Sequence, residues 1–208
     1  MGDPAPDPVT AVTSVTGVTA ETPVTPATPA TPATWPGHSV IVVAVPALEE
    51  LVRERTRHYD AAYVAADRDF AHAHVTLLGP FVDAADLTER VRADVAGVVG
   101  RHRRFTASFG RVAQFADGMI HLLPDDDQPF RRLTADLAAA FPDHPPYGGR
   151  YRDPRPHVTL DRAGPGVDVE TVRRWTAPLT PARTEVDEVR LSWYEQEACR
   201  TLATWQLG

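Results

Sequence analysis

The tetrapeptide HVTL stands at residues 74–77 and is repeated at residues 157–160. Each copy lies in a run whose residues predict a β-strand. Because successive side chains of a strand point to opposite faces, the histidine and the threonine of each copy share one face, while the valine and the leucine share the other. We therefore expect two strands that each offer an imidazole and a hydroxyl on one side and anchor in a core on the other.

The same order of elements surrounds both copies: a strand that ends in proline, a helix, the HVTL strand, a second helix and a further strand. The expected strands are 39–46, 71–81, 104–115, 118–124 and 156–163, the expected helices are 47–59, 83–99, 128–141 and 167–179, and a hairpin over 185–208 closes the chain. This order predicts a duplicated unit, in which a pseudo-twofold arrangement brings both HVTL copies to one central groove.

Composition indicates the domain organisation and excludes several classes of protein. Residues 1–36 form a Pro/Thr/Ala/Val-rich tail without helical or strand periodicity, so we expect disorder there and one folded domain over 37–208. The formal charge of −7 argues against binding to duplex DNA through a basic face. Neither a membrane span nor a signal sequence is visible, and Cys199 is the only cysteine, so we expect a cytoplasmic protein without disulfides. A monomer is the default expectation.

Two imidazoles and two hydroxyls around one groove suit phosphodiester hydrolysis. This reaction needs a base for the attacking water or hydroxyl, an acid for the departing oxygen, and donors for the non-bridging oxygens. An imidazole with a pKa of about 6.5 can serve as acid or base near neutral pH. We therefore expect His74 and His157 to divide the proton transfers and Thr76 and Thr159 to hold the phosphate, without a metal or a cofactor.

The two motifs resemble those of a known family. HVTLLGPF (74–81) and PHVTLDR (156–162) resemble the two H-x-T-x signatures of the 2H phosphoesterase superfamily, which includes bacterial RNA 2′,3′-cyclic phosphodiesterases, also called 2′-5′ RNA ligases. Over residues 38–208 the resemblance implies an α+β fold of two pseudo-symmetric lobes, each a mostly antiparallel sheet backed by helices, with the catalytic pair in a central cleft. It also implies that the motif histidines are acid and base. The short LLGPF differs from the longer run ending in Leu-Gly-Glu of many bacterial members, which leaves the substrate open.

The leading hypothesis is a metal-independent phosphodiesterase that hydrolyses 2′,3′-cyclic or 2′-5′ phosphodiester bonds of RNA ends or small nucleotides. One alternative is the reverse reaction, which joins RNA ends through a 2′-5′ bond. Another is a nucleotide- or RNA-binding module without catalysis. A zinc site is a further alternative, in which His72 joins His74 and His157, because H-x-H is also a metal-ligand spacing. Which histidine is the acid depends on the direction in which the substrate lies.

Further side chains near the motifs are candidates for substrate contacts. A loop over 148–155, rich in arginine, precedes the second motif and with Tyr147 or Tyr151 is expected to grip phosphate or stack on a base, although a solvated loop has the same composition. Aromatic residues on the strand after each motif helix are candidate walls, with core packing as the alternative. The candidate contacts are Arg150, Arg152, Arg155, Arg162, Tyr151, Phe115 and Trp193.

Overall fold

The computed structural model describes residues 37–208, and the tail over 1–36, for which we expect disorder, lies outside the described residues. The strands are β1 (His38–Ala44), β2 (His74–Leu78), β3 (Phe105–Gln114), β4 (Met119–Pro124), β5 (Val158–Arg162), β6 (Ala182–Val186), β7 (Glu188–Tyr194) and β8 (Arg200–Gln206). The helices are α1 (Glu49–Tyr59), α2 (Glu89–Val99), α3 (Gln128–Ala140) and α4 (Val169–Thr176). The predicted order of strand, helix, strand, helix, strand is therefore present twice. Over 37–208, no helix combines the length and the apolar character that a membrane crossing requires.

The strands form one sheet, which corrects the expectation of two separate sheets. All eight strands pair antiparallel in the order β6-β3-β4-β5-β2-β1-β7-β8. The two motif strands, β2 and β5, meet in the middle of this order through the pair Val75 and Val158. A central cleft between two sheets would leave the backbone groups of both strand edges unpaired, and pairing them across the seam satisfies those groups. The α+β class is confirmed.

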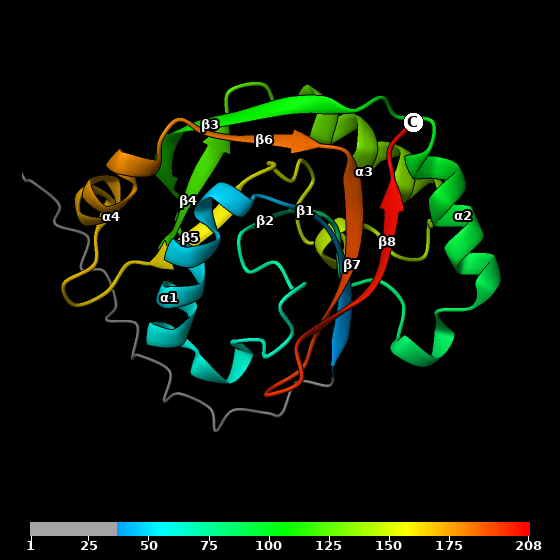
Figure 1. Ribbon diagram of the computed structural model, residues 1–208, viewed down its shortest axis with the longest axis horizontal. Coiled ribbons are helices and arrows are strands. Elements are labelled where there is room, and N and C mark those ends of the chain that lie inside the picture. Colours follow the sequence, from blue (N-terminus) through cyan, green and yellow to red (C-terminus); the bar gives the residue numbers. More distant parts are fainter. Residues whose placement is uncertain (1–36) are drawn as a thin grey trace, which may run out of the picture. The chain divides into compact units, whose positions relative to one another are not determined.

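The two halves exchange elements across this seam. The last strand of the first half, β3, pairs with β4 of the second half, and β7 of the second half pairs with β1 of the first. Likewise α1 packs against β5, and α3 packs against β2. Figure 1 shows the resulting curl of the sheet, with β3 and β6 across the top of the view and β7 and β8 down its right side. Each half is thus completed by parts of the other.

Both motif strands carry a β-bulge at the same place. The residue after the motif threonine, Leu77 in β2 and Leu160 in β5, is an extra residue that has no partner on the neighbouring strand. A bulge shifts the alternation of side chains. Consequently Leu77 and Leu78 are both buried, and so are Leu160 and Asp161. The matching bulges support the prediction of a duplicated unit.

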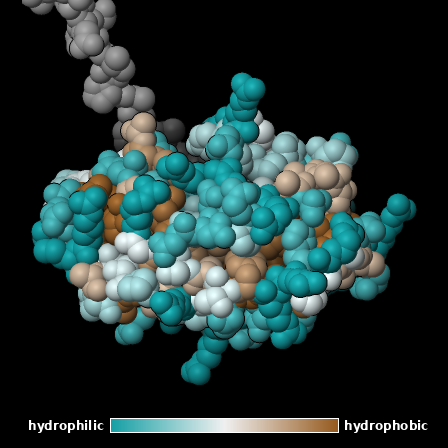
Figure 2. Space-filling view, turned by 90° about the horizontal axis from the view of Figure 1, so that it is seen from above, coloured by the Kyte–Doolittle hydropathy of each residue, from teal (hydrophilic) through white to brown (hydrophobic). Residues whose placement is uncertain are grey.

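Local signals explain where two of the helices begin. The Thr88 side chain accepts a hydrogen bond from the Val91 amide and caps α2, which begins six residues later than the expected helix over 83–99. Asp168 caps α4 by accepting from the Thr171 amide. The apolar faces of the helices then pack into one core with the buried side of the sheet. Hydrophilic residues predominate on the face drawn in Figure 2, with hydrophobic residues only in small separate areas.

Candidate active site

The two motifs meet as a square of four polar side chains. On either side of the Val75–Val158 pair, the antiparallel register brings His74 opposite Thr159 and Thr76 opposite His157. Directly opposite residues share a face, with Cβ atoms about 4.5–5.5 Å apart, and diagonal ones are about 7–8 Å apart. The four side chains are half-buried, whereas the valines between them are fully buried. The sheet therefore places two imidazoles and two hydroxyls on one face.

The His74 ring is held by the backbone and lies beside Tyr194. Its Nδ1 lies 3.0 Å from the Ala71 carbonyl, so Nδ1–H donates there and Nε2 keeps the lone pair. The Tyr194 hydroxyl is 3.3 Å from Nε2 and 3.4 Å from Nδ1. A point equidistant from both nitrogens cannot be in line with either, so this is a contact and not a strong hydrogen bond. Burial lowers the pKa of His74, and repulsion from His157 lowers it further.

The His157 ring is held in the same way. Its Nδ1–H donates to the Arg155 carbonyl at 2.7 Å, which leaves Nε2 as the free nitrogen. Burial lowers the pKa of His157, and the hydrogen bond to Arg155 partly opposes this. Two aromatic rings flank it edge to face, Phe115 at a centroid distance of 5.0 Å and His121 at 5.2 Å. Both motif histidines thus present Nε2 as the atom that can exchange a proton.

The aromatic side chains near the two histidines differ partly from the expectation. Phe115, one of the candidate contacts, lies against His157. Trp193 does not approach His74, because it lies on the opposite face of β7 from Tyr194 and donates its indole N–H to Glu195 at 2.8 Å. Tyr194, which sequence reasoning missed, takes that place instead. The register of β7 on β1, which pairs Tyr194 with His38, decides which of the two aromatic residues faces the site.

His121 is a second site residue that the sequence did not reveal. It lies on β4 directly opposite Thr159, so its side chain is on the face that carries the square. Its ring stacks on Phe115 with a centroid distance of 3.8 Å and is only 1% exposed. In the sequence it stands within the apolar run MIHLLP, which predicts only a buried strand. Only the register of β4 on β5 places His121 beside the motif residues, and the sequence pattern does not reveal that register.

The structure engages His72 elsewhere. Its Nδ1 lies 2.6 Å from Glu49, and its Nε2 accepts the Ala65 amide at 3.1 Å, so both ring nitrogens already have partners. The side chain is buried. Within 37–208, no group of three or more His, Cys, Asp or Glu residues is arranged to hold a metal ion. His72 therefore supports α1 against the strand that carries His74.

The loop before the second motif sends one tyrosine toward the first motif. Tyr147 has a left-handed backbone with φ of 54°, and its N–H donates to the Gly79 carbonyl at 2.6 Å. Burial raises the pKa of Tyr147, and a hydrogen bond with the Thr76 side chain partly opposes the rise. Tyr151 packs edge to face on Tyr147 and remains 50% exposed.

The candidate arginines are all exposed, and two of them contribute backbone or structural contacts. The Arg155 carbonyl accepts the hydrogen bond from His157, and the Arg162 guanidinium donates to the Asp117 carbonyl at 3.3 Å. The side chains of Arg150 and Arg152 lie at the surface of the loop. Solvent-exposed guanidinium groups remain available to an anionic ligand, but the structure brings none of them into the square.

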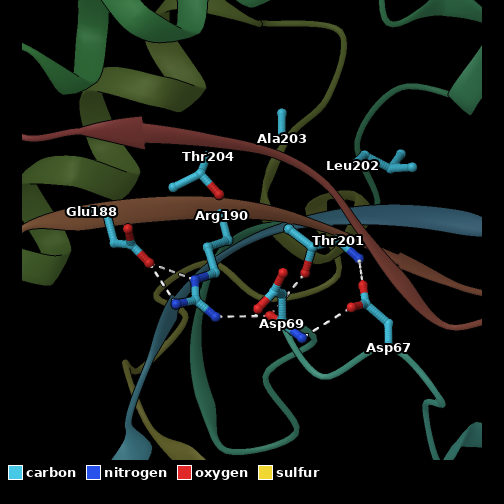
Figure 3. Close-up of a pocket in the computed structure, with 8 residues that line it drawn as sticks. All are labelled: Asp67, Asp69, Glu188, Arg190, Thr201, Leu202, Ala203 and Thr204. Atoms are coloured by element: carbon cyan, nitrogen blue, oxygen red, sulfur yellow. Dashed lines mark hydrogen bonds and ion pairs between the residues drawn. The ribbon is translucent and has the colours of Figure 1, made fainter.

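A pocket of about 430 Å³ lies away from the square, between β7, β8 and the loop before β2 (Figure 3). None of the four motif side chains lines it. Several of its polar groups are paired with each other: Arg190 bonds Glu188 at 2.6 Å and the Asp69 carbonyl at 2.8 Å, and the Thr201 amide donates to Asp67 at 2.8 Å. Because the pocket contains no motif residue and its arginine already has partners, the square is the better candidate site.

Comparison with known proteins identifies the fold. The structure of TT0787 from Thermus thermophilus superposes with a TM-score of 0.57 at 17% identity, covering 81% of this chain and 97% of that one. Escherichia coli LigT complexed with 3′-AMP superposes with a TM-score of 0.50 at 19% identity, covering 83% and 98%. At these identities the likeness concerns the fold alone. A comparison with curated proteins finds no significant match.

The sequence itself gives the family. Residues 44–198, most of the chain, match the model of the 2′-5′ RNA ligase superfamily, and this range includes both HVTL motifs. The chain therefore belongs to the 2′-5′ RNA ligase superfamily, the 2H phosphoesterases that its two motifs resemble.

Proposed function

We propose that the protein is a phosphodiesterase that hydrolyses 2′,3′-cyclic or 2′-5′ phosphodiester bonds of RNA ends or small nucleotides. The observation that carries this proposal is the square of two imidazoles and two hydroxyls around the Val75–Val158 pair. Membership of a superfamily of phosphoesterases supports it. The E. coli LigT structure with 3′-AMP adds that a protein of the same fold takes a nucleotide as ligand.

The geometry suits in-line attack at phosphorus. With the phosphate over the square, the two histidines stand diagonally on either side of it and the two threonines on the other diagonal. One Nε2 takes the proton of a water as its oxygen bonds to phosphorus, and the other histidine gives its Nε2 proton to the ribose oxygen as the P–O bond breaks. The threonine hydroxyls donate to the non-bridging oxygens. Solvent then restores both protonation states.

The fixed tautomers support these roles. Each Nδ1–H is committed to a backbone carbonyl, of Ala71 or of Arg155, so each ring can exchange a proton only through Nε2. Because the carbonyls also fix the rings, little reorganisation is needed when the substrate arrives. Which ring is acid and which is base follows from the direction in which the substrate enters.

The test is a panel of 2′,3′-cyclic nucleotides and 2′-5′ dinucleotides incubated in EDTA and resolved by chromatography. We expect turnover by the wild type and a fall in kcat of about 10²- to 10⁴-fold for His74→Ala and for His157→Ala. The fall in kcat of the double variant should not exceed the product of the two single falls, because the two residues act in one step. His58→Ala changes an exposed histidine of α1 and is the matched control, with wild-type activity expected.

Other outcomes assign other functions. Activity that requires added Zn²⁺ would contradict the metal-independent mechanism. Tight nucleotide binding without turnover on any substrate would replace the enzyme with a binding module. The reverse reaction, joining RNA ends through a 2′-5′ bond, uses the same groups, and the family name makes it worth testing. RNA with a 2′,3′-cyclic phosphate and a 5′-hydroxyl, incubated with the protein, separates the two by product length.

A further inference from the structure

The two halves of the square differ at the position beside each motif threonine. On β4, His121 lies directly opposite Thr159, whereas on β1 the corresponding place opposite Thr76 holds Val42. Both side chains are buried, His121 to 1% exposure and Val42 completely. A small aliphatic residue therefore fills this position in the first half, and packing alone does not account for an imidazole in the second. A buried polar ring needs a partner for its nitrogens.

Only one nitrogen of His121 has a partner within residues 37–208. Its Nδ1 lies 3.3 Å from the Met119 carbonyl, and a ring nitrogen that faces a carbonyl oxygen carries the hydrogen. Nε2 therefore holds the lone pair, and no other group of the described residues donates a hydrogen bond to it. Burial lowers the pKa of His121 to about 4, so the ring is uncharged at neutral pH and the lone pair remains available. An unpaired acceptor thus stands at the edge of the square.

The His121 ring is also fixed in place. It stacks on Phe115 with an interplanar angle of 19° and meets His157 at 66°. Its neighbours across the strand are the hydroxyl and the imidazole that we assign to phosphate binding and proton transfer. A neutral acceptor in this place repels the phosphate anion and attracts a donor that lies next to it. In a ribonucleotide with a phosphate on O2′ or O3′, the nearest donor is the adjacent ribose hydroxyl.

We propose that His121 is a specificity-determining residue, whose Nε2 accepts a hydrogen bond from the ribose hydroxyl next to the reacting phosphate. In a 2′-5′-linked substrate this donor is the 3′-hydroxyl, and in the product of a cyclic phosphate it is the hydroxyl released by ring opening. Where the phosphate is on O3′, the donor is the 2′-hydroxyl, which a deoxyribonucleotide lacks, so the contact selects ribose among 3′-phosphates. This inference rests on the proposed function, because it places the phosphate on the square.

The test is calorimetric binding of 3′-AMP and of 2′-deoxyadenosine 3′-monophosphate, which does not depend on turnover. A hydrogen bond contributes about 0.5–1.5 kcal/mol, so the wild type should bind 3′-AMP about 3- to 10-fold more tightly than the deoxy compound. His121→Phe keeps a ring against Phe115 but has no acceptor, and its ratio should fall to about one. His121→Val imitates Val42 and provides a second variant if the first does not fold.

His58→Ala, which changes an exposed histidine of α1, is the control. It should leave the affinities for both nucleotides, and their ratio, as in the wild type. An unchanged ratio in a folded His121 variant, or a wild type that does not prefer 3′-AMP, would overturn the inference and leave the proposed function standing. Failure of the wild type to bind either nucleotide would instead overturn the proposed function, and the inference with it.

Discussion

Replacing Asp161 by alanine should lower the free energy of unfolding by about 3–5 kcal/mol, because it leaves a buried charge without its partner. Asp161 lies in β5 directly after the second motif and pairs with Arg55 of α1 at 2.5 Å. The two side chains are only 3% and 14% exposed, and the Arg55 guanidinium also lies 4.4 Å from the Trp175 ring. Without the carboxylate, the guanidinium loses its ion pair in a mostly buried place, where water replaces it only in part.

The first half of the chain suggests how to remove the pair without this penalty. The residue that corresponds to Asp161 after the first motif is Leu78, which is completely buried. Apolar replacement of a buried ion pair is often neutral or stabilising. The double variant Asp161→Leu with Arg55→Met should therefore be more stable than Asp161→Ala by about 2 kcal/mol or more.

Urea unfolding followed by tryptophan fluorescence and circular dichroism measures both effects. The slope of free energy against urea should stay constant, so that the change in midpoint reports stability. In a chain of this size, each kcal/mol also moves the melting temperature by about 2–4 °C. A loss below about 1 kcal/mol for Asp161→Ala, or a double variant as unstable as that single one, would refute the reasoning.

Three further predictions concern the square and its neighbour. Thr76→Val or Thr159→Val removes one hydrogen bond to a charged phosphate oxygen, which contributes about 1.5–3 kcal/mol, so kcat/KM should fall about 10- to 100-fold. A fall in kcat/KM of less than about 3-fold in steady-state assays would contradict the phosphate-binding role. Burial lowers the pKa of both His74 and His157 from 6.5, so the bell-shaped pH profile of kcat/KM should peak below pH 6.5, and a peak above pH 7 would count against this pair. The folded protein binds the His121 proton only at about pH 4 and the unfolded chain at about 6.5, so this group favours folding above pH 6.5 and progressively less as the pH falls toward 4. Urea titrations should show His121→Phe losing less stability than the wild type over that range, by up to about 3 kcal/mol, and equal losses would contradict a buried neutral ring.

The sequence predicted the local features well. Strand alternation placed His74 and Thr76 on one face, because that periodicity is fixed by the backbone. Repetition of HVTL predicted the duplicated order of elements, and with it the meeting of the two motifs. The strand expected over 71–81 is present but shorter, since β2 ends at Leu78, directly before Gly79 and Pro80.

The long-range features could not be predicted in the same way. Whether β2 and β5 pair in one sheet depends on register between distant segments, which no local pattern encodes. The register of β7 on β1 likewise selects Tyr194 in place of Trp193. His121 and Asp161 are polar residues in apolar strands. Their burial is understood only from residues distant in the sequence, Thr159 opposite His121 and Arg55 paired with Asp161.

The exchange of β3 and β7 across the seam has a consequence for how such a site can diversify. If the two units were separate identical molecules, any substitution on one side would appear on both, and the reaction centre would have to treat the two ends of a diester alike. Fusion into one polypeptide lifts that symmetry constraint, so Val42 can stand in one copy where His121 stands in the other, and Leu78 where Asp161 stands. The residues that differ between the two copies can then determine the direction in which the diester binds, while the shared fold keeps the distances between the catalytic groups constant.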